Sequence, residues 1–374
     1  MFVSGIGKTQ FGVLAQDIRQ LAYEAACKAL WDAGIGPADL DAIYLSNFLG
    51  GPDASQLHLN SVVAGLLQGF GRPAVRIETA CATGGAALFE ALRSGHGTVL
   101  VLGVEKMTGV DGKSQGRNIG YAGDRELDQR EGLIFPASYA LIAQQHMLRH
   151  GTTPEDLALV AFKNHRNARL NPQAHFHYKD VTMEDIRKSQ VVSSPLRLFD
   201  CSPITDGAAA VVLSSKRAGD RCVQIAGSAL ATDSISLVQR RELTTFPAAR
   251  SAASKALSQA GIGIADIGVM EVHDCFTIAE LVAMEDVGLC KPGESKEWVR
   301  AGRTQINGDV AVNPDGGLKA DGHPIGATGV AQACEIVLQL RGEAGARQVK
   351  GAQAGLTHNV GGVGGTAAVH VFKV

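Results

Sequence analysis

Apolar and polar positions alternate along this chain in short runs, which are separated by longer stretches with helical spacing. Alternation with a period of two predicts strands, whereas apolar positions recurring every three to four residues predict amphipathic helices. Strands that alternate with helices indicate the α/β class. We expect strands at about 2–6, 75–77, 208–214, 223–228, 268–272 and 366–373, and helices at roughly 136–150, 155–168, up to 287, and 327–341.

The chain also repeats itself. Residues 26–36 (ACKALWDAGIG) are echoed by residues 253–263 (ASKALSQAGIG), and each run continues into an Asp-containing turn and a strand. A second echo joins residues 81–84 (CATG) to residues 326–329 (GATG) in the same order. We therefore predict two related halves, 1–219 and 220–374. The polar region at about 111–195 is predicted to be an insertion that lies over the first half.

Composition narrows the function. The 374 residues carry a formal net charge of -2, which gives no electrostatic reason to bind nucleic acid or an anionic membrane. The beginning of the chain does not resemble a signal peptide, and no apolar run reaches the roughly 18 residues of a membrane span. The seven cysteines include no C-x-x-C pair, which argues against a disulfide framework and a zinc site. The expected location is the cytoplasm.

Cys81 stands where the strand at 75–77 is predicted to pass directly into a helix. The N-terminus of a helix favours negative charge, so the position should favour the thiolate, which is the nucleophilic form. Gly84 and Gly85 weaken a helix by roughly 1 kcal/mol each, and we expect close approach by another helix or a ligand to compensate. The alternative is that Cys81 is a buried small hydrophobe.

Two further segments lie just before predicted helices, and the first of them also follows the end of the strand at 268–272. His273 and Cys275 lie in residues 271–276 (EVHDCF), and His323 lies in a glycine-rich turn with the sequence GHP. Ligand sites in α/β folds gather where strands end and helices begin. Each residue taken alone has a structural explanation, but together with Cys81 they supply a nucleophile, a base and a second acid/base for acyl transfer through a thioester.

A glycine-dense stretch at 355–365 is predicted to form the turn before the last strand. It carries His358, Asn359 and Gly361, and its backbone amides are candidates for an oxyanion site. Three histidines in the insertion could suggest a metal, but no carboxylate or thiol cluster accompanies them. We instead expect loop histidines that meet a ligand or the solvent: His165, His175 and His177.

These segments resemble the thiolase superfamily, and most closely its sterol-carrier-protein-type branch. The likeness rests on CATG at 81–84, HDCF at 273–276, GHP at 322–324 and HNVG at 358–361, and it covers nearly the whole chain. The resemblance implies a five-layered αβαβα thiolase fold built from two βαβαβαββ halves and a loop domain. It also implies a homodimer or homotetramer that uses coenzyme A as a substrate and has no tightly bound cofactor or metal.

Carried over to this sequence, the resemblance makes Cys81 the nucleophile that accepts the acyl group. His323 would activate Cys81, His273 would serve an oxyanion site, and Cys275 would be the second acid/base. The amides of Cys81 and Gly361 would form the other oxyanion hole. Other thiolases place the second cysteine in the C-terminal glycine-rich turn, where this chain has residues 358–361 (HNVG). If these roles hold, the sulfur of Cys81 should lie within about 8 Å of both imidazoles.

Several functions remain compatible with these residues. A thiolase would cleave 3-oxoacyl-CoA or condense two acyl-CoAs. A thiolase-fold C-acyltransferase or CoA-ester aldolase would work with a small partner protein, and a scaffold subunit would hold a partner such as an OB-fold protein. A ketoacyl synthase would use a Cys-His-His set but not Cys275. Four basic residues of the insertion are candidates for binding the CoA 3′-phosphate: Lys163, Arg166, Arg169 and Lys179.

Overall fold

The computed structural model describes residues 1–217 and 219–374. Four of the α-helices begin at a residue whose side chain caps the first turn. For example, Asp17 accepts hydrogen bonds from the first turn of α1, while the side chain of Gln20 bonds back to the Asp17 amide. The first half contains, in chain order, β1 (Phe2–Lys8), α1 (Ile18–Ala33), β2 (Ala42–Ser46), α2 (Leu59–Leu66), β3 (Ala74–Ile77), α3 (Thr83–Arg93), β4 (Thr98–Glu105) and β7 (Gly207–Ser214).

The second half repeats this order of elements, with two additional helices. It contains β8 (Val223–Thr232), α8 (Pro247–Ala260), β9 (Val269–Val272), α9 (Thr277–Asp286), α10 (Ser295–Arg300), β10 (Ala311–Val312), α11 (Gly317–Ala320), α12 (Ile325–Arg341), β11 (Ala354–Gly361) and β12 (Thr366–Lys373). The 3₁₀ turns of the two halves are η1 (Pro37–Asp39), η4 (Leu237–Gln239), η5 (Ile264–Asp266) and η6 (Gly345–Arg347).

Within the described residues, the strands of both halves form one mixed sheet of ten strands, in the order β10-β9-β11-β12-β8-β1-β7-β4-β2-β3. The order reads the same from either end when each strand is replaced by its counterpart in the other half. The halves meet where β1 pairs with β8 antiparallel, opposing Phe2 to Gln224 and Val3 to Val223. The predicted βαβαβαββ duplication is therefore confirmed.

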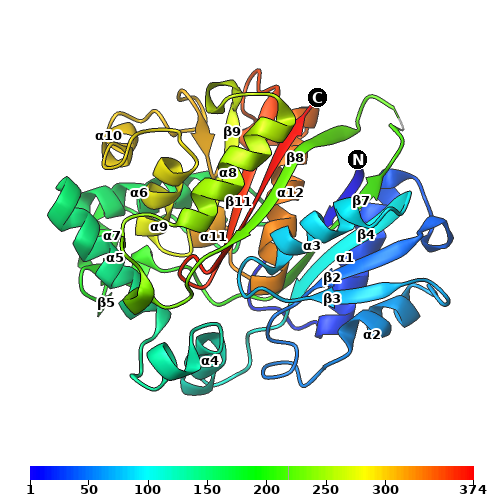
Figure 1. Cartoon of the computed structure of the whole chain (residues 1–374), viewed down its shortest axis with the longest axis horizontal. Helices are drawn as coiled ribbons and strands as arrows, with labels where there is room; N and C mark the ends of the chain where they lie inside the picture. The colour runs from blue at the N-terminus through cyan, green and yellow to red at the C-terminus, as the bar shows by residue number, and fades with distance from the viewer. Residues whose placement is uncertain (218) are drawn as a thin grey trace.

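The layers follow from which faces the helices cover. α1 packs on β1 and β7, and its counterpart α8 packs on β8 and β12, so that these helices form outer layers (Figure 1). α3 and α12 contact each other and strands of both halves, which makes them the central layer. Apolar side chains of these two helices, including Leu88 and Val330, join the largest core cluster. The arrangement is the predicted five-layered αβαβα fold.

Both sequence echoes correspond to repeated structure. Gly34 ends α1 with φ 68° and Gly261 ends α8 with φ 66°, a left-handed conformation that glycine adopts without steric cost. The second echo places Gly84 of α3 against Gly329 of α12. A Cβ atom on Gly84 would lie 2.8 Å from the backbone of Gly329, so the predicted close approach is by another helix.

Most of the insertion packs against the second half. The predicted position over the first half holds for Gln115 and Asn118, which donate to Asp53, and for Gln173, which bonds to the backbone of Lys8 and Phe11. Tyr139, Ile142 and Leu157 share a core cluster with Phe246 and Ile278, because apolar faces of the insertion's helices meet the helices that follow β9. Figure 1 shows two helices of the insertion, Phe135–His150 and Pro154–Ala168, beside α9 and α10. Its elements are α4 (Gly112–Gly120), the π-turn η2 (Arg125–Gln129), α5 (Phe135–His150), α6 (Pro154–Ala168), α7 (Met183–Lys188), β5 (Val191–Ser193), β6 (Leu196–Arg197) and η3 (Leu198–Asp200).

The histidines of the insertion do not behave alike. His165 lies on α6 and is 1 % exposed, with its ring between Phe176 and Phe199 at centroid distances of 4.9 and 5.3 Å. The expectation of a solvent- or ligand-facing residue is therefore wrong for His165, because helical spacing turns it into the core. His175 and His177 are half-buried. In the described parts of the chain, no helix has the length and apolarity required to cross a membrane.

Candidate active site

Cys81 lies in a tight turn that connects β3 to α3. The helix begins only at Thr83, so the cysteine precedes it and the predicted direct passage from strand to helix is wrong by this turn. Ala80 has φ 52°, which brings the chain around sharply. The Thr83 hydroxyl accepts a hydrogen bond from the amide of Thr79 at 2.9 Å and donates to the carbonyl of Ala80. The turn holds Cys81 buried but not sealed, at 8 % exposure.

The resting state of Cys81 is a thiol. Burial raises its pKa to about 12, and the negative charge of Glu105 raises the pKa as well. The backbone amides of Gly362 and of Cys81 itself donate toward the sulfur and oppose this rise, without outweighing it. The expectation that the helix start would favour the thiolate is therefore wrong: desolvation outweighs the amide donors. Forming the thiolate requires a base at the site.

His323 is held in the turn between α11 and α12. Its amide donates to the hydroxyl of Thr205 at 2.8 Å, and its Nδ1 lies 2.7 Å from the hydroxyl of Thr328. That hydroxyl donates its hydrogen to the carbonyl of Pro324 at 3.1 Å, so it acts as acceptor toward the ring. With the hydroxyl in this orientation, the hydrogen of the neutral imidazole is on Nδ1, and Nε2 carries the free lone pair. This is the tautomer of a general base.

His273 follows the end of β9 and is held in the opposite tautomer. Asn359 accepts from the amide of Gly85 at 3.0 Å, which fixes the orientation of the side-chain amide. Its Nδ2 then donates to the carbonyl of Cys81 at 2.9 Å and to Nδ1 of His273 at 3.2 Å. The hydrogen of the His273 ring is therefore on Nε2, an atom that is buried and has no partner in the described protein. His273 presents an N–H donor.

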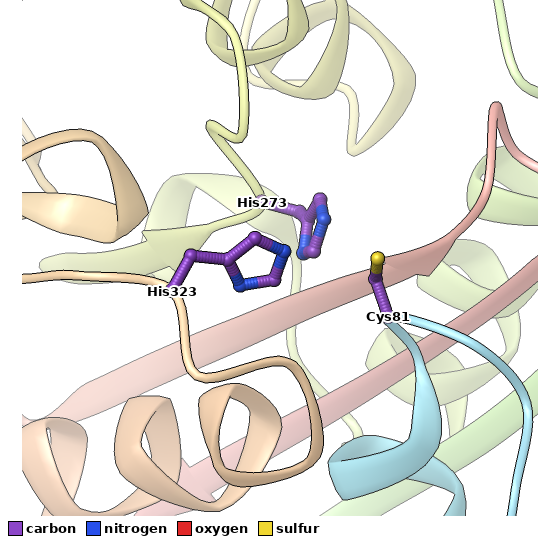
Figure 2. A group of neighbouring side chains, drawn as sticks. All are labelled: Cys81, His273 and His323. Atoms are coloured by element: carbon purple, nitrogen blue, oxygen red, sulfur yellow. The ribbon is translucent and has the colours of Figure 1, made fainter. Parts of the chain in front are cut away.

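The structure brings these three side chains together. The sulfur of Cys81 and one ring nitrogen each from His273 and His323 all lie within 4.8 Å of one another (Figure 2). The two rings are 5.2 Å apart between centroids and are nearly perpendicular. Burial lowers the pKa of His323 to about 3 and holds that of His273 well below its usual range, so both rings are neutral. The cluster thus combines a thiol, a lone pair and a donor.

The spacing of this cluster is also short enough for three ligands of one metal ion. Metal coordination would require a lone pair on Nε2 of His273, where Asn359 instead fixes a hydrogen. If the His273 hydrogen moved to Nδ1, it would face the N–H group of Asn359 Nδ2. The Asn359 amide cannot rotate to avoid this, because its oxygen accepts the hydrogen bond from Gly85. The donor set is therefore better suited to polarising a carbonyl oxygen than to holding a cation.

Cys275 lies beyond His273, in the loop before α9. Its thiol hydrogen-bonds with the hydroxyl of Tyr139, and that hydroxyl also donates to the carbonyl of Gly362 at 3.0 Å. Burial holds the pKa of Cys275 well above its usual range, and the neighbouring Cys81 adds to the rise. Cys275 is therefore protonated at rest, near the nucleophile and tied to the glycine turn through Tyr139.

The other predicted site residues lie on β11, because residues 354–361 form a strand and the turn contains only the four residues that follow, 362–365 (GVGG). The prediction of a turn for 355–365 is thus wrong over most of its length; apolar residues at Leu356 and Val360 bury the segment between two neighbouring strands. Nδ1 of His358 accepts a hydrogen bond from the backbone amide of His273 at 3.4 Å, so His358 contacts the backbone of the cluster and not its imidazole rings. Gly361 packs against the carbonyl of Thr79.

Of the four basic residues considered for CoA, Lys163 is already engaged. It is buried, donates to the carbonyl of Val312 at 2.7 Å and pairs with Glu280 at 2.7 Å. Arg169 pairs with Asp180 at the surface. Sequence reasoning missed three residues that hold the cluster, because their side chains are recognisable only through partners distant in the chain: Glu105, Tyr139 and Thr328.

A duplicated α/β fold whose halves bring a buried cysteine and two imidazoles together defines a class of enzymes equipped for acyl transfer. Comparison with known families agrees. The model "Thiolase, N-terminal domain" matches residues 2–217, and "Thiolase C-terminal domain-like" matches residues 229–374. The chain belongs to the thiolase family.

Individual relatives refine this membership. The chain is 47 % identical to an acetyl-CoA acetyltransferase of Methanothermobacter thermautotrophicus, over 99 % of this chain and 98 % of that protein. It is 34 % identical to human sterol carrier protein 2, over 100 % of this chain and 72 % of that protein. Among solved structures, the Ltp2-ChsH2(DUF35) aldolase superposes with a TM-score of 0.84 at 27 % identity, covering 100 % of this chain and 97 % of the other.

Proposed function

We propose that this chain is a CoA-dependent thiolase that cleaves 3-oxoacyl-CoA and, in the reverse direction, condenses two acyl-CoAs through an acyl-Cys81 intermediate. The observation that carries the proposal is the opposed tautomers of the two histidines. His323 offers a lone pair at the thiol of Cys81, and His273 offers an N–H in the same space. A nucleophile beside a base and an oxyanion donor is the equipment of acyl transfer.

In the cleavage direction, Nε2 of His323 accepts the proton of Cys81 as the sulfur attacks the 3-oxo carbon. The C2–C3 bond then breaks, which leaves the acyl group on sulfur and the enolate of acetyl-CoA as leaving group. The N–H of His273 stabilises the enolate oxygen, and Cys275 gives its proton to C2. The amides of Cys81 and Gly362 donate toward the oxygen of the acyl group, in the place proposed from the sequence for Cys81 and Gly361.

The second half-reaction returns the enzyme to its resting state. The thiol of free CoA transfers its proton to Cys275, and its sulfur attacks the acyl group on Cys81. The leaving thiolate of Cys81 takes the proton that His323 has held, so that both cysteines end protonated. Each is protonated at rest because burial raises its pKa. The two thiols therefore divide the work: Cys81 carries the acyl group and Cys275 carries the proton.

A cavity of about 230 Å³ lies against the Cys81 turn and provides a route for the thioester. Thr79 and Ala80 of that turn line the cavity, and Gly361 of β11 lines it as well. Tyr121 of the insertion also lines it, so both halves and the insertion border the same opening. We place the pantetheine arm of CoA here, because an arm entering at this opening reaches the Cys81 turn directly.

The test is thiolysis of acetoacetyl-CoA by the purified chain with free CoA and no added protein. We expect two acetyl-CoA per substrate, and a mass increase of one acetyl group on a peptide containing Cys81 when the reaction is quenched before CoA is added. Cys81→Ser should abolish both signals, and Cys27→Ser, which alters a half-buried cysteine on α1, should abolish neither. Full thiolysis by Cys81→Ser would disprove the proposal.

A second candidate is carbon–carbon chemistry that depends on a small partner protein, such as CoA-ester aldol cleavage or C-acylation. The similarity to the Ltp2-ChsH2(DUF35) aldolase favours it. The paired thiols of Cys81 and Cys275 weigh against it, because retro-aldol cleavage needs no acyl-enzyme. The same assay separates the two candidates: a chain that is inactive alone, forms no acetyl-enzyme and gains activity only with a partner would support the second.

A further inference from the structure

Glu105 is the last residue of β4, and its side chain is completely buried. Its carboxylate accepts four hydrogen bonds. Three come from the segment after β2: Asn47 Nδ2 at 2.6 Å, and the amides of Phe48 and Leu49, both at 2.9 Å. The fourth comes from the amide of Gly326 at 2.9 Å, in the first turn of α12. One carboxylate therefore joins a loop of the first half to a helix of the second.

The segments that Glu105 ties together surround the cysteine. Leu49, Met107 and Ile325 pack on Cys81 in one small apolar cluster. Leu49 donates its own amide to Glu105, Met107 follows Glu105 by two residues, and Ile325 precedes the bonded Gly326. The three apolar residues that pack on Cys81 therefore bond to Glu105, or lie within two residues of Glu105 or of a group that bonds to it.

Neighbouring contacts seat the start of α12 against the first half. Ser46 at the end of β2 donates through its hydroxyl to the carbonyl of Gly326 at 2.5 Å. β4 and the start of α12 pack closely at Gly103, where a Cβ atom would lie 2.4 Å from the carbonyl oxygen of Gly326. His323 is three residues earlier in the chain, so the seat of α12 also decides how far that ring stands from Cys81.

The charge of Glu105 also reaches the site. In the described protein no Lys or Arg pairs with Glu105, and the facing groups are the amides already named, Asp53 and Cys81. Burial raises the pKa of Glu105 to about 7, although the bonded amides oppose the rise. Its negative charge in turn raises the pKa of the Cys81 thiol. The residue therefore acts on the nucleophile both by position and by charge.

We propose that Glu105 is a positioning residue for the thiolase reaction: it fixes the distance between Cys81 of one half and His323 of the other. Glu105 does not contact the reacting atoms. The inference rests on the proposed function, since its kinetic readout is thiolysis. Alkylation of Cys81 by iodoacetamide supplies a second readout that does not depend on which reaction the enzyme catalyses.

The informative variants are Glu105→Gln, which removes the charge and sets an amide group against the N–H donors, and Glu105→Asp, which keeps the charge but shortens its reach. We expect each to lower kcat for thiolysis about tenfold or more with a smaller change in KM, since a displacement near 1 Å has a large effect on rate. Glu90→Gln is the matched control, because Glu90 is an exposed carboxylate on α3 and does not join the halves.

The rate at which iodoacetamide alkylates Cys81 should distinguish the effect of the Glu105 charge from the effect of its hydrogen bonds on the position of α12. Between pH 6 and 9, the logarithm of the wild-type rate should rise with a slope below one near pH 7, because ionisation of Glu105 raises the pKa of the thiol as the pH climbs. Glu105→Gln should remove this bend and react several-fold faster than wild type above pH 7. Glu105→Asp and Glu90→Gln should both retain the bend.

A purely structural role would lower stability without removing the bend, and that result would overturn the proposal. Wild-type kcat in both Glu105 variants would overturn it as well. If Glu105→Gln does not fold, Ser46→Ala tests the same seat by removing the bond to Gly326, and a kcat equal to wild type in both Ser46→Ala and Glu105→Asp would then refute the inference. If the wild type shows no thiolysis but its alkylation rate still bends near pH 7, the proposed function is refuted while the link between Glu105 and Cys81 stands.

Discussion

The starts of α3 and α12 are equivalent positions of the duplicated fold, and they use the same device for different chemistry. In each, a threonine hydroxyl donates to a carbonyl of the preceding turn: Thr83 to Ala80, and Thr328 to Pro324. In the first half the hydroxyl accepts from the amide of Thr79, whereas in the second it faces the ring of His323. The two helix starts therefore share the threonine-to-carbonyl bond, but the threonine contacts a backbone amide in the first half and the imidazole of His323 in the second.

The consequence is a division of labour between the halves. The first half supplies the thiol on a turn that the Thr83 hydroxyl holds, and the second half supplies both imidazoles, whose tautomers are fixed by Thr328 and Asn359. Neither half contains a complete set, so the reaction is confined to the place where the two halves meet. The following predictions test this division, beginning with the largest expected effect.

Removing the thiol should have the largest effect. Cys81→Ser keeps the turn and the volume but replaces the sulfur with a hydroxyl that His323 cannot ionise to a useful extent. We expect thiolysis of acetoacetyl-CoA to fall about a thousandfold or more. The melting temperature should stay close to that of the wild type, which differential scanning fluorimetry can check. A large drop in melting temperature would mean that the loss reflects unfolding.

The two imidazoles should differ. His323→Asn removes the lone pair that accepts the proton, whereas His273→Asn can replace one N–H donor with another. We expect kcat to fall about a hundredfold or more for His323→Asn, in the range for a lost general base, and by a smaller factor for His273→Asn. Steady-state kinetics at one pH decides this. Equal losses in both variants would contradict the assignment of a base and a donor.

The paired threonines test the repeated device directly. Thr328→Val removes the acceptor that orients the His323 ring and should lower kcat about tenfold, because a supporting contact in the site is lost. Thr83→Val leaves the buried amide of Thr79 without its acceptor and should mainly lower the free energy of unfolding, by about 1–3 kcal/mol. Urea unfolding and kcat, measured on both variants, reveal which half uses its threonine for catalysis. The reverse pattern would refute the comparison.

The contact between the two helix starts should be visible in stability. Gly329→Ala would place a Cβ 2.4 Å from the Gly85 amide nitrogen and 2.4 Å from the Asn359 side-chain oxygen. We expect a loss of about 1–3 kcal/mol in urea unfolding, the range for overpacking. Gly65→Ala in α2 is the control: nothing lies within 4 Å of its added Cβ, and the change should be neutral or slightly stabilising.

The smallest expected effect is the response to pH. Burial lowers the pKa of His323 to about 3, so the base stays unprotonated as the pH falls through the usual range of histidine. Because kcat/KM reports groups of the free enzyme, its value for acetoacetyl-CoA should change less than about threefold between pH 8 and 5.5 in Glu105→Gln, which lacks the carboxyl group whose pKa burial raises to about 7. A loss with a midpoint near 6.5 would show that the ring titrates as an exposed histidine.

Local pattern was sufficient for the architecture. The echo of residues 26–36 at 253–263 predicted two equivalent helix ends, and Gly34 and Gly261 adopt nearly the same left-handed conformation. Helix ends and strand alternation depend on residues close in sequence, so a single chain records them. The paired glycines at 84 and 85 likewise indicated a close approach, which the contact with α12 supplies.

Tertiary structure decided what local pattern could not. Most of the insertion at 111–195 packs on the second half because apolar faces of its helices contact helices more than a hundred residues away, and no pattern of neighbouring residues predicts that contact. The protonation of Cys81 was mispredicted for a related reason: the helix start is a local feature, but burial by Leu49, Met107 and Ile325 is not. The sequence named the chemical groups, and long-range packing determined their charge states, their tautomers and the distances between them.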